Sequence, residues 1–191
     1  MNRPQPLPSP QPGLNADPRF VGYYAEQSES DATRQRFEGV RRVTLGLRTS
    51  LGRTTESLDI VDIGCGAGMQ ALMWSAEGHR AQGIDISEPL VELARQRATS
   101  RGLDARFHVR SATALGLPDA SADVVLVSEL LEHLPTWQPC VDEALRILRP
   151  GGVVYLSTTN RLCPKQQEFA LPIYSWYPAW LKRHCERLST T

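Results

Sequence analysis

The feature that most constrains the fold is a buried-strand pattern that ends in three closely spaced glycines. Residues 58–63, Leu-Asp-Ile-Val-Asp-Ile, are mostly apolar and β-branched, as in a strand of a parallel sheet. Gly64, Gly66 and Gly68 follow at alternate positions, and helix-forming residues come after them. A strand, a glycine turn and a helix in this order let a ligand approach backbone N–H groups at a helix N-terminus. The stretch therefore predicts an α/β fold with a ligand site where this strand ends.

Strand and helix patterns alternate along the rest of the chain. This alternation predicts a three-layer Rossmann-like sandwich, with helices on both faces of a mostly parallel sheet. The predicted strands are residues 58–63, 80–86, 104–109, 123–127 and 153–157. The helices between them are expected at 68–78, after a cap at Ser87, and around a buried stripe of Val141, Ala144, Leu145 and Leu148.

Residues 31–50 show clear helical periodicity ahead of this alternation. Apolar and small side chains recur every three or four residues, and arginines occupy the other side, Arg48 among them. This pattern predicts an amphipathic helix with a buried stripe and a solvated arginine face. Ser28 is expected to open a capping box with Asp31 before this helix. The predicted buried stripe consists of Phe37, Val40, Thr44, Leu47 and Leu51.

Composition divides the chain into four segments. Residues 1–18 hold six of the 14 prolines and are expected to be a disordered tail. Residues 19–57 are expected to carry N-terminal helices, including a short one at 20–24, and residues 58–160 to form the ligand-binding core. Residues 161–191 are rich in aromatic side chains. We interpret them as a cover over the bare edge of the fifth strand, as a substrate lid, as a peripheral membrane contact or as the remainder of a truncated domain.

Charge and cysteine content exclude several classes of protein. The chain has 21 Lys and Arg against 21 Asp and Glu, a balance that gives no general attraction to nucleic acid. Its four cysteines contain no C-x-x-C pair, which argues against a zinc site or a disulfide framework. No apolar run approaches the roughly 20 residues of a membrane span, and no signal peptide is evident. A cytoplasmic, soluble protein is therefore expected.

The glycine spacing separates two classes of cofactor. A dinucleotide fingerprint, G-x-G-x-x-G, would place its third glycine at position 69, where this chain has Met69. The sequence instead reads G-x-G-x-G, preceded by Asp62 at the end of the strand. This spacing disfavours a nicotinamide dinucleotide.

The stretch Val61–Gly68 resembles the first motif of the class I S-adenosylmethionine-dependent methyltransferases. Three later stretches resemble that family's motifs in the same order: Asp85 within residues 83–87, the approach to a strand at 114–123, and the turn at 148–152. The resemblance implies the family's fold, its cofactor and methyl transfer. Family members carry two further strands after the fifth, and no such pattern follows residue 157. The sheet is therefore expected to lack the last strands.

The resemblance also implies which residues bind S-adenosylmethionine. Asp85 would accept hydrogen bonds from both ribose hydroxyls, and Ile86 would pack on the adenine. Asp62 would order the turn and favour the cationic end of the cofactor. Ser111 stands where the family usually has Asp. In that place its hydroxyl would accept a hydrogen bond from the adenine amino group. The complete predicted set is Asp62, Gly64, Cys65, Gly66, Gly68, Asp85, Ile86, Ser111, Ala112 and Ser128.

A Glu-x-x-Glu-His run follows the fourth predicted strand and resembles the ubiquinone-biosynthesis O-methyltransferases. If the run is helical, Glu129, Glu132 and His133 share one face. His133, together with Glu132, could act as a general base on a phenol. The three side chains could instead hold a divalent metal that orients a catechol-like oxygen pair, or the run could serve only to cap and order the loop.

These motifs predict an enzyme that methylates a small molecule at oxygen. The alternative is a non-catalytic or truncated protein that binds S-adenosylmethionine, which the absence of the last strands motivates.

Overall fold

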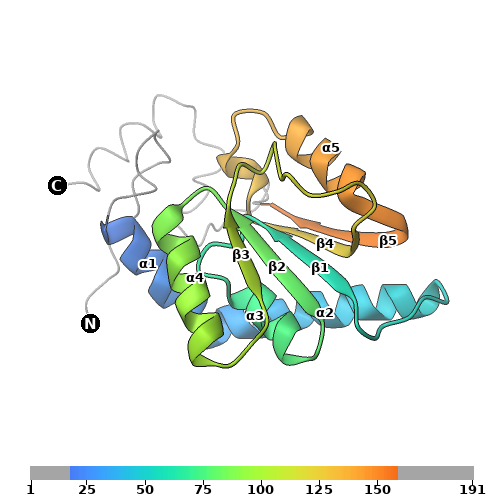
Figure 1. Ribbon diagram of the computed structural model, residues 1–191, viewed down its shortest axis with the longest axis horizontal. Helices are drawn as coiled ribbons and strands as arrows, with labels where there is room; N and C mark the ends of the chain where they lie inside the picture. Colours follow the sequence, from blue (N-terminus) through green and yellow to red (C-terminus); the bar gives the residue numbers. More distant parts are fainter. Residues whose placement is uncertain (1–17, 159–191) are drawn as a thin grey trace, which may run out of the picture. The chain divides into compact units, whose positions relative to one another are not determined.

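The described part of the chain is a parallel sheet with helices on both faces (Figure 1). The computed structural model describes residues 18–158, within one compact unit of the chain. Its strands are β1 (Asp59–Ile63), β2 (Arg80–Asp85), β3 (Arg106–Val109), β4 (Ala122–Ser128) and β5 (Leu148–Ser157). They lie in the order β3-β2-β1-β4-β5, and every pair is parallel. The predicted Rossmann-like α/β sandwich is confirmed.

The helices divide between the two faces of the sheet. Their bounds are α1 (Pro18–Ser28), α2 (Asp31–Ser50), α3 (Met69–Ala76), α4 (Glu88–Ser100), the 3-10 turn η2 (Leu131–His133) and α5 (Gln138–Ile147). Side chains of α2, α3 and α4 pack on one face around the buried Trp74. Side chains of α5 pack on the other face, where Cys140 is fully buried against the strands. The strand order reverses between β1 and β4, and open α/β sheets bind ligands at such a point.

Helix α2 has the predicted bounds and only part of the predicted buried stripe. Val40, Thr44 and Arg48 are buried, whereas Leu47 and Leu51 are 46% and 56% exposed. The expectation that Arg48 lies in solvent is therefore wrong. Its guanidinium donates to the carbonyl oxygens of Thr54 and Asp123, at 3.0 and 3.1 Å, and these partners compensate its burial.

The cap of α2 also differs from the expectation. Ser30 is the N-cap residue, and its hydroxyl accepts from the backbone N–H of Thr33 at 3.2 Å. The hydroxyl of Ser28 instead donates to the carbonyl of Ala25, at 2.7 Å, in the last turn of α1. Because α1 reaches Ser28, this residue ends one helix rather than beginning the next.

Helix α5 is likewise rotated from its predicted stripe. Cys140, Ala144 and Ile147 are buried, while Leu145 is 57% exposed. The prediction that Leu145 faces the core is wrong, because the buried face of α5 runs through Cys140, Ala144 and Ile147. Leu148, also in the predicted stripe, already begins β5. Pro18, expected in the tail, is the first residue of α1. The rest of the predicted tail, the aromatic segment 161–191 and any further strands lie outside the described residues.

An ion-pair network holds the amino edge of the sheet, by which we mean the side where the strands begin. The carboxylate of Asp59 pairs with the guanidinium groups of Arg80 and Arg149, each at 2.7 Å. Arg149 also pairs with the carboxylate of Asp123 at 2.9 Å. Hydrogen bonding from Arg80 is the main reason why the pKa of Asp59 lies below its ordinary value. These pairs join β1, β2, β4 and β5 at the edge opposite the carboxyl ends of the strands.

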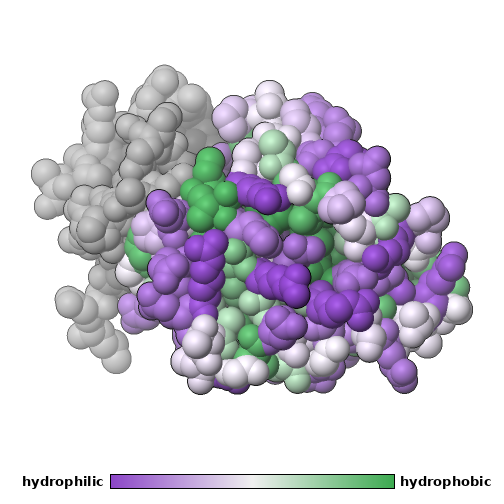
Figure 2. Space-filling view, in the orientation of Figure 1, coloured by the Kyte–Doolittle hydropathy of each residue, from purple (hydrophilic) through white to green (hydrophobic). Residues whose placement is uncertain are grey.

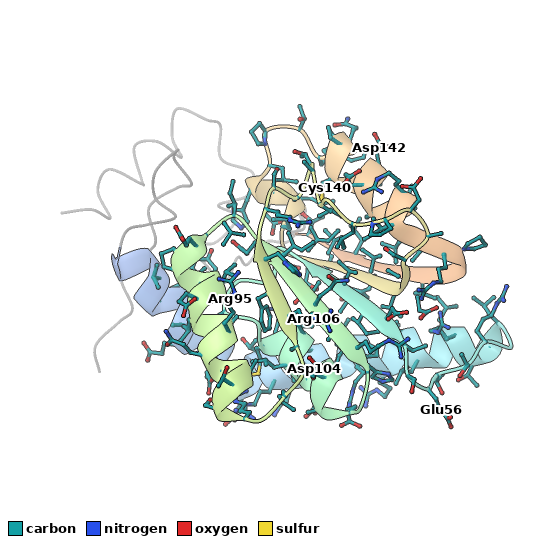
Figure 3. All side chains as sticks on the ribbon, in the orientation of Figure 1. Glu56, Arg95, Asp104, Arg106, Cys140 and Asp142 are labelled. Atoms are coloured by element: carbon teal, nitrogen blue, oxygen red, sulfur yellow. The ribbon has the colours of Figure 1, made fainter. Side chains whose placement is uncertain are left out.

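The β3 edge is covered by charged side chains. Arg95 of α4 donates through Nε and Nη2 to the carbonyl oxygen of Phe107, at 3.1 and 2.8 Å. Figure 3 labels Arg95 on α4 and Arg106 on β3, and Figure 2 shows hydrophilic residues over much of this face. Charged side chains at an edge strand protect it from pairing with other chains. No helix among residues 18–158 is long and apolar enough to cross a membrane.

Candidate active site

The predicted binding residues gather at the carboxyl ends of β1, β2 and β3. The turn 64–68 follows β1, and the N–H groups of Gly64 and Cys65 donate to the carbonyl of Ile84 in β2, at 2.8 and 3.1 Å. After β3, the N–H of Arg110 donates to the carbonyl of Asp85 at 2.9 Å. The glycine turn, the Asp85 carboxylate and the residues after β3 therefore lie at one edge of the sheet.

The three glycines of the turn have similar backbone angles but different surroundings. Their φ angles are 75°, 51° and 82°, in the left-handed region that favours glycine. A Cβ at Gly64 would lie 2.9 Å from the Leu130 side chain, and one at Gly68 would lie 2.6 Å from the Cβ of Ala94. A Cβ at Gly66 would meet no atom within 4 Å. Protein packing thus explains Gly64 and Gly68, whereas Gly66 faces open space.

Asp85 holds the turn from the end of β2. Its Oδ2 accepts from the N–H of Gly66 and its Oδ1 from the N–H of Ser87, both at 2.8 Å. Burial raises the pKa of Asp85, and the N–H groups of Ser87 and Gly66 oppose this shift. A carboxylate has about four acceptor positions, so that both oxygens can still accept from a ligand. The neighbouring Ile86 side chain is 61% exposed.

Asp62 lies beneath the turn and is only 2% exposed. Burial, followed by the charge of Asp85, raises the pKa of Asp62 to about 7, and a hydrogen bond from the N–H of Ala71 opposes the shift. Its Oδ2 is buried without a hydrogen-bond partner in the described part of the chain. The hydrogen bond from Ala71 places the carboxyl group against the first turn of α3.

The Cys65 side chain fills the space beside Gly83, a glycine of β2. A Cβ at Gly83 in β2 would lie 2.7 Å from the Sγ of Cys65. Burial is the main reason why the pKa of the Cys65 thiol lies well above its ordinary value, and Asp62 and Asp85 raise it further. Because the thiolate is the reactive form of cysteine, this side chain is a packing group rather than a nucleophile.

Ser111 and Ala112 begin the segment between β3 and β4, and both are half-buried. The hydroxyl of Ser111 lies 2.9 Å from that of Thr113 and accepts from the Thr113 N–H at 3.2 Å. The same segment is tied to α5, because Glu143 accepts from the N–H of Leu115 at 2.9 Å.

Two polar side chains that the sequence analysis did not single out also reach this edge. Gln70, in the first turn of α3, is 2% exposed and accepts from the hydroxyl of Ser128 at 3.1 Å. Arg97, on α4, donates through Nη1 to the carbonyl of Ala67 in the glycine turn, at 3.0 Å. A glutamine inside an otherwise apolar helix was a signal for the first. Nothing in the pattern of α4 distinguished Arg97 from a solvated arginine.

The Glu-x-x-Glu-His run does not form the predicted helix. Only Leu131–His133 make a single 3-10 turn, and Glu129 precedes it with a φ of 51°. Leu130 and Leu131 pack into the α5-side core, and the Glu129 N–H donates to the carbonyl of Ser157 at 3.0 Å. This packing turns the chain, so that the helical face expected to unite Glu129, Glu132 and His133 is absent.

The metal hypothesis finds no support in this geometry. Between residues 18 and 158, no group of three or more His, Cys, Asp or Glu side chains could hold a metal ion. Glu132 accepts from the hydroxyl of Thr158 at 2.8 Å, and both Glu132 and His133 are exposed. The assignment of His133 and Glu132 as catalytic residues stays a prediction.

Comparison with known proteins finds relatives that share this core. Residues 61–156 match the family described as "Methyltransferase domain". The chain is similar to the ubiquinone biosynthesis O-methyltransferase of Parvibaculum lavamentivorans, 30% identical over 138 residues, which cover 72% of this chain and 54% of that protein. The enzyme of the same name from Coxiella burnetii is 29% identical over 108 residues, covering 56% and 46% of the two chains. The chain thus spans about half the length of these curated relatives.

Solved structures share the fold. The PH0226 protein from Pyrococcus horikoshii has a TM-score of 0.58 and 25% identity, and the match covers 67% of this chain and 55% of that one. A SAM-dependent methyltransferase from Methanosarcina mazei has a TM-score of 0.50 and 30% identity, and the match covers 56% of this chain and 54% of that one.

Proposed function

The chain belongs to the methyltransferase domain family, and from this premise we propose that it transfers a methyl group from S-adenosylmethionine to an oxygen of a small molecule. The observation that carries the proposal is the pairing of Gly66 with Asp85. Open space lies where Gly66 lacks a Cβ, and the Asp85 carboxylate borders it through the Gly66 N–H. A carboxylate beside an accessible backbone suits a ligand that carries a ribose diol and no phosphate.

The remaining predicted residues fit this cofactor in chemical type. Asp85 would accept from the ribose hydroxyls with the acceptor positions that Gly66 and Ser87 leave. Ile86 offers an exposed apolar surface for an adenine ring. Ser111 and Ala112 follow β3 near Asp85, and Ser128 ends β4. Asp62 and Cys65 would act by ordering and packing the turn, because the Asp62 side chain is buried beneath it and the Cys65 side chain packs against Gly83.

Methyl transfer to oxygen places few demands on the protein. The bound sulfonium supplies an activated methyl group, so that much of the rate can come from alignment of the acceptor. His133 would accept the phenol proton of the acceptor as its oxygen becomes the nucleophile. An exposed imidazole at the carboxyl edge suits this role, since a neutral imidazole has one ring nitrogen that can accept a proton. Two curated relatives with O-methyltransferase names support oxygen as the acceptor atom.

The test of this proposal is transfer of a labelled methyl group to a phenolic acceptor by the purified chain. We expect His133→Ala to lower turnover roughly 10²-fold, with the affinity for S-adenosylhomocysteine nearly unchanged, because the imidazole would act only on the acceptor. His108→Ala, which removes an imidazole from β3, is the matched control and should retain turnover.

Three outcomes would contradict parts of the proposal. Equal turnover by His133→Ala and wild type would leave η2 with an ordering role only. Transfer to amines or carbon acids, but to no phenol, would overturn oxygen as the acceptor atom. Cofactor binding without transfer of label to any product in a cell extract would favour a non-catalytic binding protein, which the half-length match to the relatives motivates.

A further inference from the structure

We infer that Arg97 is a positioning residue that couples the shape of the glycine turn to the docking of the N-terminal helix α1. The inference rests on the proposed function in one respect, that the turn 64–68 binds the cofactor. Arg97 is contributed by α4, which lies beside α1 (Figure 1). Its guanidinium contacts both the turn and the end of α1, and its side chain is only 14% exposed.

On the side of the turn, Arg97 restrains the carbonyl group of Ala67, which lies between two glycines. Ala67 lies between Gly66 and Gly68, both with left-handed backbone angles, and Arg97 Nη1 donates to its carbonyl oxygen at 3.0 Å. Asp85 holds the N–H of Gly66 at 2.8 Å. Because glycines permit many backbone conformations, such side-chain restraints select the one observed. Asp85 and Arg97 thus hold neighbouring positions of the turn from two different elements.

On the side of α1, the same guanidinium binds the last helical turn. Its Nη1 donates to the hydroxyl of Ser28 at 2.9 Å, and its Nη2 donates to the carbonyl of Ala25 at 3.0 Å. Its Nε lies 3.3 Å from the carboxylate of Glu29. The planar fork of an arginine can serve several acceptors at once, which the single ammonium of a lysine cannot reproduce.

This arrangement makes the two structural states depend on one another. If the Ala67 carbonyl moves, Arg97 loses a partner that helps to compensate its burial, and its contacts to Ala25 and Ser28 are disturbed. A ligand that fixes the turn should therefore strengthen the docking of α1. By the same factor, undocking of α1 should lower the affinity of the turn for the ligand. The predicted role is indirect, since Arg97 itself would not contact the cofactor.

Arg101 provides a matched control on the same helix. It is the C-cap residue of α4, one turn beyond Arg97, and it contacts Glu29 at 2.7 Å, so that the two arginines share an acidic partner. Within residues 18–158, Arg101 contacts no group of the turn 64–68, and its Nη1 lies 3.9 Å from the sulfur of Met69, the first residue of α3. Arg101→Met therefore removes a cation that pairs with Glu29 and leaves the Ala67 restraint in place.

The first experiment is a calorimetric titration of the full chain with S-adenosylhomocysteine. Arg97→Met should raise the Kd roughly 10-fold or more, because a charge-assisted hydrogen bond to the turn is lost. Arg97→Lys should raise it less, since an ammonium can still donate to one carbonyl, and Arg101→Met should stay within about twofold. In turnover assays, Arg97→Met should raise the KM for the cofactor and leave the KM for the acceptor unchanged.

The second experiment is hydrogen exchange of the ligand-free chain, which does not depend on the proposed function. Arg97→Met should speed exchange both at residues 66–69 and in the last turn of α1, whereas Arg101→Met should affect only α1. Failure of wild type to bind S-adenosylhomocysteine would overturn the proposed function and leave the exchange result to decide the inference. The inference would be overturned if Arg97→Met exchanged at residues 66–69 as slowly as wild type, or if its Kd equalled that of Arg101→Met. If Arg97→Met does not fold, Arg97→Lys takes its place. Its Kd and its hydrogen exchange at residues 66–69 are then compared with those of Arg101→Met.

Discussion

At the residue scale, the three glycines of the turn share a left-handed backbone and differ in what a side chain would meet. Gly68 packs against Ala94 and Phe107, whereas Gly66 faces open space bordered by Asp85. The two positions therefore separate the packing of the turn from its proposed contact with a ligand.

We predict that Gly68→Ala and Gly66→Ala fail in different ways. At Gly68 the added methyl would lie 2.6 Å from the Cβ of Ala94, so that both overpacking and backbone strain oppose folding. We expect it to lower the free energy of unfolding by roughly 2–4 kcal/mol. At Gly66 only the strain of about 1–2 kcal/mol applies, while the methyl enters the proposed cofactor space.

The measurement is urea denaturation of both variants beside calorimetry with S-adenosylhomocysteine. Gly66→Ala should lose most of its affinity and less of its stability than Gly68→Ala. Wild-type affinity in Gly66→Ala would show that the cofactor does not approach this glycine.

Single residues were predictable where spacing alone carries the information. The glycines and Asp85 follow from motif positions, because the backbone of a strand–turn–helix unit determines where they lie. Arg48 and Arg97 were not predictable, because their partners are carbonyl groups on other segments: the carbonyl of Asp123 is 75 positions from Arg48. A helical pattern assigns long cations to solvent, and only the folded chain shows which of them serve a buried carbonyl.

At the element scale, the segment between β3 and β4 depends on one acidic residue of α5. Glu143 accepts from the N–H of Leu115 at 2.9 Å and pairs with Arg146, which also donates to the carbonyl of Leu117 at 2.8 Å. The hydrogen bond from Arg146 is the main reason why the pKa of Glu143 lies at about 2. This contact holds the segment that contains Ser111 over the sheet.

We predict that Glu143→Gln destabilises the chain at neutral pH by roughly 1–2 kcal/mol. Because the folded pKa of Glu143 lies below the ordinary value of 4.5, its contribution is present above about pH 4.5. It is lost as the pH falls from about 4.5 towards 2. The stability difference between wild type and variant should therefore shrink over that interval.

Urea denaturation at several pH values checks this prediction. Asp142→Asn, which alters the exposed neighbour on the outer side of α5 (Figure 3), is the control and should change stability little. A difference between wild type and Glu143→Gln that stays constant from neutral pH to pH 3 would contradict the role assigned to the carboxylate.

Elements were predicted well where hydrophobic periodicity is strong. Strands β1, β2 and β4 fall within one residue of their expected bounds, and α2 matches at both ends. The run at 129–133 was predicted wrongly, because helical spacing of Glu129, Glu132 and His133 does not reveal that Leu130 and Leu131 are drawn into the core between them. Local spacing cannot show a competing tertiary contact.

At the scale of the whole described core, the two ends of the sheet have different roles. The amino edge is closed by the pairs of Asp59 and Asp123 with Arg80 and Arg149. The carboxyl edge, at the reversal of strand order, carries the glycine turn, Asp85 and η2. The fold class and this polarity follow from the strand–helix alternation. The acceptor of the proposed methyl transfer does not, because no motif of the core encodes it.

The measurement that tests the central claim most directly is a calorimetric titration of the chain with S-adenosylhomocysteine, beside Asp85→Ala and Asp59→Asn. The second variant changes a carboxylate at the opposite edge of the sheet and serves as the control. We predict micromolar binding by wild type and by Asp59→Asn, and a loss of roughly 10²-fold in Asp85→Ala, because two charge-assisted hydrogen bonds disappear. Absence of binding by wild type, or undiminished binding by Asp85→Ala, would contradict the account.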